Sequence, residues 1–489
     1  MWRFETASAT PGPVETLNDF VGRQTWRFDE SAASSTDDAA DRRAQVEAAR
    51  TRFAASAATQ KHSSDKLLRQ QCMYAAEKEQ GEPPLLSTPE AAAIAASRRD
   101  PTDHGDVRAS LAAGASYFAR LQQSDGHWAG DYGGPMFLLP GMLIACHVTG
   151  VLEEVFPTKH HTEEALRYLT LHQNPDDGGF GLHIEGHSTM FCTVLNYVSM
   201  RILGLKPEDE RCARARRWIR ARGGATRVAS WGKFWLAVLG CYSWAGVNPM
   251  PPEAWLLPHA KWTGIGWIHP GRYWCHCRMV YLPMSYLFGA RVGGCGDASG
   301  FSPLVAELRG ELFTEAGGFA SVDWDAARNK CAEEDVYYPH PKVRAEGEEK
   351  KREFFFFSSG FFSFLFFGFF SLFQKKPTSP LLLVSPLPSS HQQVQDLLWW
   401  CMSRIEPLAV GTKLRKMALN KVAEHVSYED EQTRHICIGP VNKVVNMLVR
   451  FFHDGPGSEG FRRHIPRLQD YLWVAEGEFF LFGGVGGAF

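Results

Sequence analysis

The sequence predicts an all-α protein built from repeated helical units. From Val107 onward apolar residues recur at helical spacing, as in Leu111, Ala115 and Phe118, and the pattern continues through residues 136–148. Alternation of the kind typical of strands is scarce. Two helical stretches also end in a similar phrase about 50 residues apart, a period typical of helix-pair arrays whose units bury their faces against neighbours.

Residues 1–100 differ from this helical region. They are polar, charged and rich in Ala and Ser, and a helical stretch at about residues 37–59 carries few large apolar side chains. Pro83 and Pro84 mark a break. We therefore expect residues 1–100 to form an extended or wrapping segment.

The repeated phrase runs from Gln122 to Trp128 and again from Gln173 to Phe180. A Gln amide can satisfy free backbone groups at a helix end, Gly can make the turn, and an aromatic ring can cover the junction. Because only two clear copies are present, chance similarity stays open as the alternative.

Residues 342–393 interrupt the helical pattern. The Phe-rich stretch Phe354–Phe373 would span roughly 30 Å as a helix, enough to cross a bilayer, and it has basic residues on both sides. Its Phe, Ser and Gly composition is unusual for a membrane helix and favours a low-complexity insertion. The transmembrane anchor remains the second interpretation.

Charge and cysteine usage narrow the function classes. The 489 residues include 52 basic and 54 acidic side chains, which gives a net charge of −2. The chain therefore has no overall positive charge that would attract nucleic acid. Eleven Cys without a regular framework, together with an N-terminus that lacks a signal-peptide pattern, indicate reduced thiols in a protein that faces the cytosol.

The densest group of chemically active side chains lies at residues 268–286. Cys275, His276 and Cys277 are possible metal ligands, but consecutive residues seldom reach one ion and no second ligand pair follows at zinc spacing. The aromatic residues there could instead line an apolar cavity whose ring faces attract cations. An ordinary aromatic core with a hydrogen-bonded His is the third interpretation.

Several long motifs resemble the oxidosqualene cyclases. They include DGHWAGDYGGPMFLLPG (125–141), GGATRVASWGKFWLAVLG (223–240), HPGRYWCHCRMVYLPMSY (269–286), EDVYYPHP (334–341) and YEDEQTRHICIGPVNKVVNML (428–448). The resemblance covers most of residues 1–341 and 394–476, and the sequence of the motifs is most similar to that of the cycloartenol-forming members. It implies an α/α barrel with QW-type repeats at 101–341, the start of a second barrel at 394–477, and an off-pattern tail at 478–489.

The resemblance also implies a function. These isomerases fold (3S)-2,3-oxidosqualene in a cavity open to the membrane and cyclise it, with no metal or organic cofactor. Trp231, Trp274 and Tyr132 would line the cavity, and His276 would lie near the late side-chain cation. Cys277 and Tyr281 would lie at the constriction of the substrate channel. The product would be a protosterol derivative, either cycloartenol or lanosterol.

The same resemblance places the protein on the cytosolic face of the endoplasmic reticulum membrane or on a lipid droplet, as a monotopic protein that binds no nucleic acid. The family's general acid, the Asp of a DCTAE motif, is absent because the chain contains no Asp-Cys pair. We therefore expect the chain to be inactive by itself, and regard residues 342–393 and 478–489 as foreign to the family pattern. The alternatives are a non-catalytic membrane-associated fragment and a zinc-dependent α/α-barrel enzyme such as a protein prenyltransferase subunit.

Overall fold

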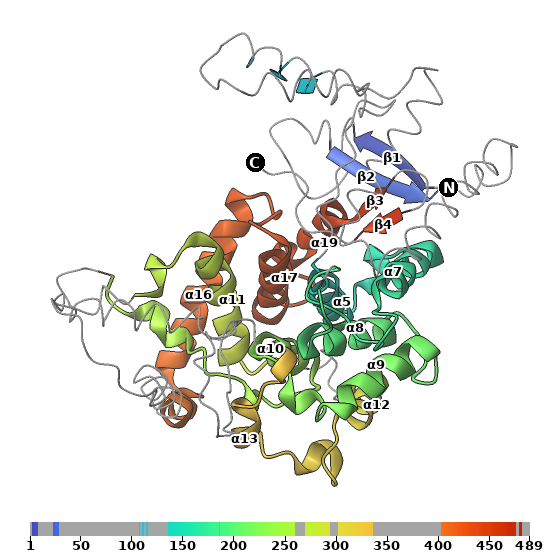
Figure 1. Cartoon of the computed structure of the whole chain (residues 1–489). Coiled ribbons are helices and arrows are strands. Elements are labelled where there is room, and N and C mark those ends of the chain that lie inside the picture. Colours follow the sequence, from blue (N-terminus) through green and yellow to red (C-terminus); the bar gives the residue numbers. More distant parts are fainter. Residues whose placement is uncertain are drawn as a thin grey trace, which may run out of the picture. The chain divides into compact units, whose positions relative to one another are not determined.

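The computed structural model describes a largely helical protein (Figure 1). The described residues are 2–7, 23–28, 107, 110–111, 114–115, 135–184, 186–259, 269–293, 302–335, 402–475 and 479–481. The chain divides into two compact units, of which the larger holds Thr6–Arg23 and Pro135–Tyr471. The predictions for residues 37–59, for Gln122–Trp128 and for the segment 342–393 lie outside the described residues.

Helices dominate the larger unit, as the sequence predicts. The described helices are α5 (Leu138–Thr149), α6 (Leu152–Val155), α7 (Lys159–His172), α8 (Met190–Ile202), α9 (Glu210–Ala221), α10 (Ser230–Leu239), α11 (Cys275–Gly289), α12 (Pro303–Leu312), α13 (Trp324–Arg328), α16 (Lys413–Gln432), α17 (Pro440–Asp454), α18 (Glu459–Arg462) and α19 (His464–Leu468). Short 3₁₀ turns join several of them, among them η4 (Pro252–Leu256) and η7 (Pro270–Arg272).

Four short strands are a feature that the sequence does not predict. β1 (Trp2–Ala7) pairs with β2 (Arg23–Phe28), and β3 (Trp473–Ala475) pairs antiparallel with β4 (Phe479–Leu481). β3 and β4 have three residues each and are too short to carry the alternating pattern by which strands are recognised.

The core of the larger unit forms around α5. This helix buries residues on every side, from Leu139 to Thr149, and it packs against α8, α10 and α17. A helix that is apolar all round is stable only inside a protein. It ends at Gly150, whose φ of 73° is a left-handed conformation that glycine adopts without strain.

The second copy of the repeated phrase has the predicted junction chemistry. Gln173 follows α7, and its amide Nε2 donates to the carbonyls of Gly178 at 2.8 Å and Arg211 at 2.9 Å. Gly178 makes the turn with a φ of 78°. Trp218 of α9 donates from Nε1 to Asp177 Oδ2 at 3.0 Å. The phrase therefore joins the end of α7 to the side of α9.

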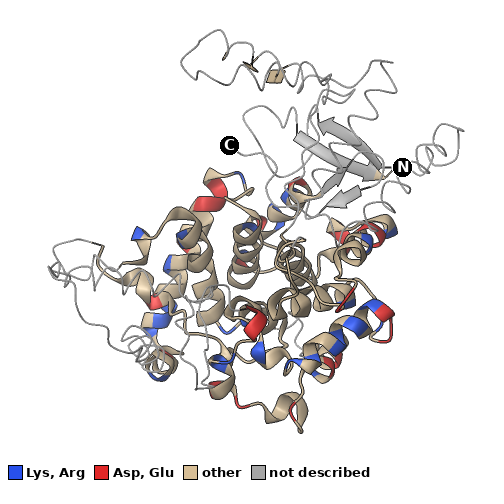
Figure 2. Cartoon of the chain, in the orientation of Figure 1, with Lys and Arg blue, Asp and Glu red and all other residues tan. Residues whose placement is uncertain are grey.

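Helix α9 carries many basic residues (Figure 2), and two of the arginines on it or at its end are used in packing. Arg214 donates to the carbonyl of Asn174 at 2.9 Å, and the guanidinium of Arg222 lies 3.9 Å from the centre of the Trp218 ring. These contacts tie the arginines to the neighbouring turn and to their own helix. They are sufficient to explain a basic helix without a lipid surface.

Within the described part of the chain, every helix is too short or too polar to cross a membrane. The segment Phe354–Phe373 lies outside that part, so the anchor interpretation stays a prediction.

Candidate functional site

The aromatic residues predicted from the sequence lie on α10 and α11. Trp231 is in the first turn of α10, and its indole Nε1 donates to the hydroxyl of Tyr281 on α11 at 3.2 Å. The two rings meet edge to face, with centroids 5.8 Å apart and planes at 80°. Burial raises the pKa of Tyr281 to about 12, so its hydroxyl stays neutral. The contact fixes two electron-rich rings against each other.

Three more of the residues named from the sequence lie at the start of α11. Trp274 precedes the helix and is 63% exposed, and its ring lies 4.7 Å from that of the exposed His276. Cys277 follows and is half-buried, and burial raises the pKa of its thiol. The structure therefore brings together Trp231 with Tyr281 and Trp274 with His276. Tyr132 lies outside the described residues, so its predicted role is untested.

A buried lysine anchors α10. Lys233, two residues after Trp231, is 2% exposed. Its ammonium group donates to three carbonyls at the end of α13 and just beyond it, those of Ala327 at 2.8 Å, Arg328 at 2.9 Å and Lys330 at 2.7 Å. The last carbonyls of a helix lack intrahelical donors and carry partial negative charge. Lys233 supplies both the donors and the opposite charge.

A second anchor fixes the end of α11. Arg415 of α16 is 3% exposed and donates from Nη1 to the carbonyl of Gly289, the last residue of α11, at 2.9 Å. Its other nitrogens pair with Glu253 and Glu406. Both acidic partners accept charge-assisted hydrogen bonds, which are stronger than neutral ones. The C-terminal end of the helix that carries His276 and Tyr281 is thus held by a paired cation.

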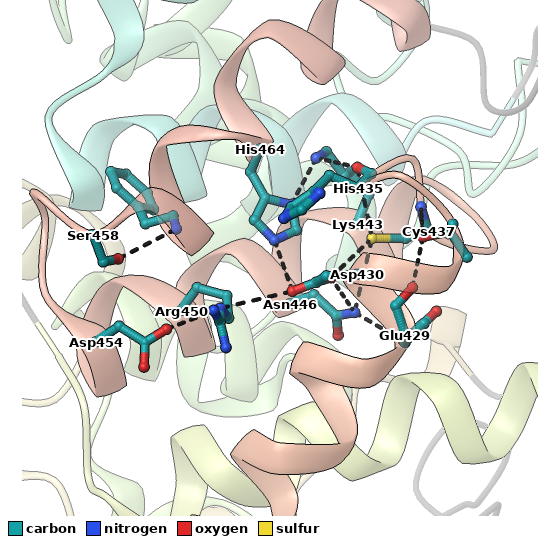
Figure 3. Close-up of polar contacts among 12 residues, drawn as sticks. Glu429, Asp430, His435, Cys437, Lys443, Asn446, Arg450, Asp454, Ser458 and His464 are labelled. Atoms are coloured by element: carbon teal, nitrogen blue, oxygen red, sulfur yellow. Dashed lines mark hydrogen bonds and ion pairs between the residues drawn. The ribbon is translucent and has the colours of Figure 1, made fainter. Parts of the chain in front are cut away.

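A buried polar network joins α16, α17 and α19 (Figure 3). Asp430 Oδ2 accepts from His464 Nε2 at 3.1 Å, and Asp430 Oδ1 accepts from Asn446 Nδ2 at 3.2 Å. The Lys443 ammonium contacts His464 Nδ1 at 2.7 Å and donates to the carbonyl of His435 at 2.6 Å. All five residues are buried. Buried polar groups of this kind are stable only when they are mutually satisfied.

Burial and charge decide the protonation of this network. Burial lowers the pKa of His464 to about 4 and that of Lys443 to about 8. Burial raises the pKa of Asp430, but the hydrogen bond from His464 and the charge of Lys443 lower it more, so its pKa lies below the usual value. At neutral pH, a neutral His464 therefore donates from Nε2 to the Asp430 carboxylate. Its Nδ1 is left to accept from the Lys443 ammonium.

The loop between α16 and α17 is strained, and the network holds it. Arg434, His435 and Cys437 have φ values of 52°, 62° and 64°. A residue other than glycine in this left-handed region costs about 1–3 kcal/mol. The Lys443 ammonium binds the His435 carbonyl, and Cys437 N–H donates to Thr433 Oγ1 at 3.0 Å. These bonds offset part of the strain.

Part of the network also has ligand chemistry. Asp430, Cys437 and His464 each offer one ligand atom, and the three atoms lie within 4.8 Å of one another. However, burial raises the pKa of the Cys437 thiol well above its usual value, which opposes the thiolate that a metal requires. The Lys443 ammonium also lies beside His464. We therefore interpret this set as hydrogen-bonded core, and the sequence-based expectation of no metal stays a prediction.

Sequence reasoning missed this network, although a signal was present. Asn442, Lys443 and Asn446 lie among Val, Met and Leu on the buried part of α17. Polar residues at core positions of an amphipathic helix indicate buried hydrogen bonds. Among the described cysteines, the buried thiols that form no disulfide are Cys146, Cys192, Cys212, Cys241 and Cys437.

Comparison with known proteins points to one family. Residues 111–312 match the model of the squalene-hopene cyclase N-terminal domain. The lanosterol synthase of Mus musculus is 41% identical over 361 residues, which cover 74% of this chain and 40% of that protein. The cycloartenol synthase of Dictyostelium discoideum is 40% identical over 360 residues, which cover 73% of this chain and 41% of that protein.

A third relative aligns over nearly all of the chain. The alpha-onocerin synthase LCD of Lycopodium clavatum is 35% identical over 488 residues, which cover 97% of this chain and 53% of that protein. The chain therefore spans about half the length of its relatives or less. By name, these relatives are synthases of lanosterol, cycloartenol and alpha-onocerin.

Proposed function

We propose a function from the premise that this chain belongs to the oxidosqualene cyclase family. Residues 101–341 form the first α/α barrel with QW-type repeats, and residues 394–477 begin a second. The junction at Gln173 supports this assignment, because its amide links the end of α7 to α9, the second helix along the chain, as the packing of neighbouring repeat units requires. The matched segment 111–312 falls within the first proposed barrel.

The proposed activity is the cyclisation of (3S)-2,3-oxidosqualene to a protosterol product. The observation that carries it is the contact of Trp231 with Tyr281. A second ring pair, Trp274 and His276, lies at the start of α11. Ring faces stabilise the successive carbocations by about 0.5–2 kcal/mol each, and a neutral buried tyrosine does not trap them as a phenolate would. Tyr132 and Cys277 complete the substrate-binding surface and its channel.

The 489-residue chain by itself should not open the epoxide. Epoxide opening needs a strong acid, and the chain contains no Asp-Cys pair of the kind the family uses. Purified chain is incubated with (3S)-2,3-oxidosqualene, and the extract is analysed by gas chromatography and mass spectrometry. We expect unchanged substrate. A cyclic product would refute this part of the proposal.

The product class can be tested in a version of the chain extended with the missing acid motif. His276 favours a protosterol-type product, cycloartenol or lanosterol. Formation of β-amyrin by the extended protein would contradict the proposal that His276 favours a protosterol-type product.

We further propose that the protein binds the membrane surface from the cytosolic side, at the endoplasmic reticulum or at lipid droplets. A water-insoluble substrate supports this location. Carbonate extraction should release a peripheral chain. Retention in the membrane pellet would instead favour the alternative function, a non-catalytic fragment anchored through Phe354–Phe373.

A further inference from the structure

A proline inside α11 leaves one backbone carbonyl without its helical partner. Pro283 lies in the middle of the helix and has no N–H to donate. In an unbroken helix that N–H would bond to the carbonyl four residues earlier, which belongs to Met279. This carbonyl lies between Cys277 and Tyr281, two residues of the proposed channel.

A side chain from α17 takes the place of the missing donor. Asn442 is 1% exposed, and its amide Nδ2 donates to the Met279 carbonyl at 2.6 Å. The bond crosses between two helices that pack against each other. It satisfies a group that would otherwise be left without its helical hydrogen bond.

The orientation of the Asn442 amide is fixed by its other partners. The backbone N–H of Ile438 donates to Asn442 Oδ1 at 3.0 Å, so the oxygen must face that loop. The nitrogen then faces α11. Its second hydrogen points toward Glu429 Oε2 and Asn446 Oδ1, both at 3.3 Å. Asn442 is therefore held at both ends before it reaches α11.

We propose that Asn442 is a positioning residue for the turn of α11 that carries Cys277 and Tyr281. It replaces the helical hydrogen bond that Pro283 removes, and so links the buried network of α16 and α17 to the turn that carries Cys277 and Tyr281. The link sets the position of that turn without touching the substrate. The effect of Asn442 on substrate binding rests on the proposed function. The link between Asn442 and the Met279 carbonyl does not, and it is tested separately.

The first test measures local opening of α11 in the 489-residue chain. Native protein is treated with N-ethylmaleimide, and the rate of Cys277 alkylation is followed by peptide mass spectrometry, with Cys331 as an internal reference. Asn442→Ala should raise the Cys277 rate about tenfold, the effect of losing one buried hydrogen bond. The Cys331 rate should stay within about twofold.

The decisive arm is rescue. Pro283→Ala restores an N–H that can bond to the Met279 carbonyl within α11. On that background Asn442→Ala should change the Cys277 rate by less than about twofold, because the carbonyl is already satisfied. Should Asn442→Ala alone fail to fold, the Pro283→Ala chain with and without it still provides the comparison. A tenfold effect that persists on this background would overturn the proposal.

Asn446→Ala is the matched control. Asn446 belongs to the same network and is fully buried, and its amide donates to Glu429 and Asp430 but not to α11. Its Oδ1 is one of two acceptors beside the second hydrogen of Asn442, so without it Asn442 keeps Glu429 Oε2, the Ile438 N–H and the Met279 carbonyl as partners. It should lower the urea midpoint and leave the Cys277 rate within about twofold. Equal acceleration by Asn446→Ala would show a general loosening of the core and would refute a specific link.

A substrate readout separates this inference from the proposed function. Retention of radiolabelled (3S)-2,3-oxidosqualene by the purified chain is compared between the parent and Asn442→Ala. We expect weaker retention in the variant and recovery in the Pro283→Ala background. Absence of retention by the parent would refute the proposed function, and the alkylation test would still decide the role of Asn442.

Discussion

Replacement of Lys233 by Met tests whether α10 is held in place by its buried ammonium group. The change keeps most of the side-chain volume but removes three donors, so the carbonyls of Ala327, Arg328 and Lys330 each lose the hydrogen bond from the ammonium group. Ala327 keeps the hydrogen bond from the Lys330 N–H. Each hydrogen bond to a charged group contributes about 1.5–3 kcal/mol. Relief of the buried charge returns several kcal/mol of this. We expect a net loss of about 3 kcal/mol in the free energy of unfolding.

The assay is equilibrium urea unfolding followed by circular dichroism. Lys416→Met is the control, because Lys416 is an exposed residue of α16 and its replacement removes the same charge. The control should stay within about 0.5 kcal/mol of the parent. If Lys233→Met unfolds at the same urea concentration as this control, the three carbonyls do not depend on the ammonium group and the anchoring of Trp231 must have another source.

Three further changes test the other contacts. Burial raises the pKa of Glu429 to about 7, so the folded protein binds the proton of this group more tightly than the unfolded chain does. The free energy of unfolding should therefore fall as pH rises from about 4.5 to about 7. Glu429→Gln should lack this fall when urea unfolding is compared at pH 5 and pH 8, and a pH profile identical to that of the parent would refute the reasoning. Tyr281→Phe removes the acceptor of Trp231 and should cost about 1 kcal/mol, with a zero effect counting against that hydrogen bond. Gln173→Ala removes both hydrogen bonds of the amide and should cost about 2 kcal/mol; an unchanged urea midpoint would contradict the junction.

The helical part of the fold could be predicted because its signals are local. Apolar spacing in residues 136–148 predicts the helix that the structure shows as α5, and the turn chemistry of Gln173 and Gly178 predicts the junction that follows α7. The strand pair β3–β4 could not be predicted, since strands of three residues carry too little pattern.

The site was predictable in its residue types but not in its geometry. The motif at 269–286 identified Trp274, His276 and Tyr281, yet spacing could not show that Tyr281 is buried against Trp231 while Trp274 is exposed. That outcome depends on how α10 and α11 pack, which is a tertiary property. The anchors of these helices come from α13, α16 and α17, far away in the sequence.

The buried polar network of α16, α17 and α19 gives the structure a directional contact that an apolar core could not supply. Replacing a buried ionic set by apolar side chains is often neutral or stabilising, so stability alone does not require Asp430, Lys443 and His464 in the core. Their bonds have direction, however. They hold the loop that contains Cys437, which in turn presents the Ile438 N–H that orients Asn442. An apolar core would fill the same space, but it could not direct an amide at a single carbonyl of α11.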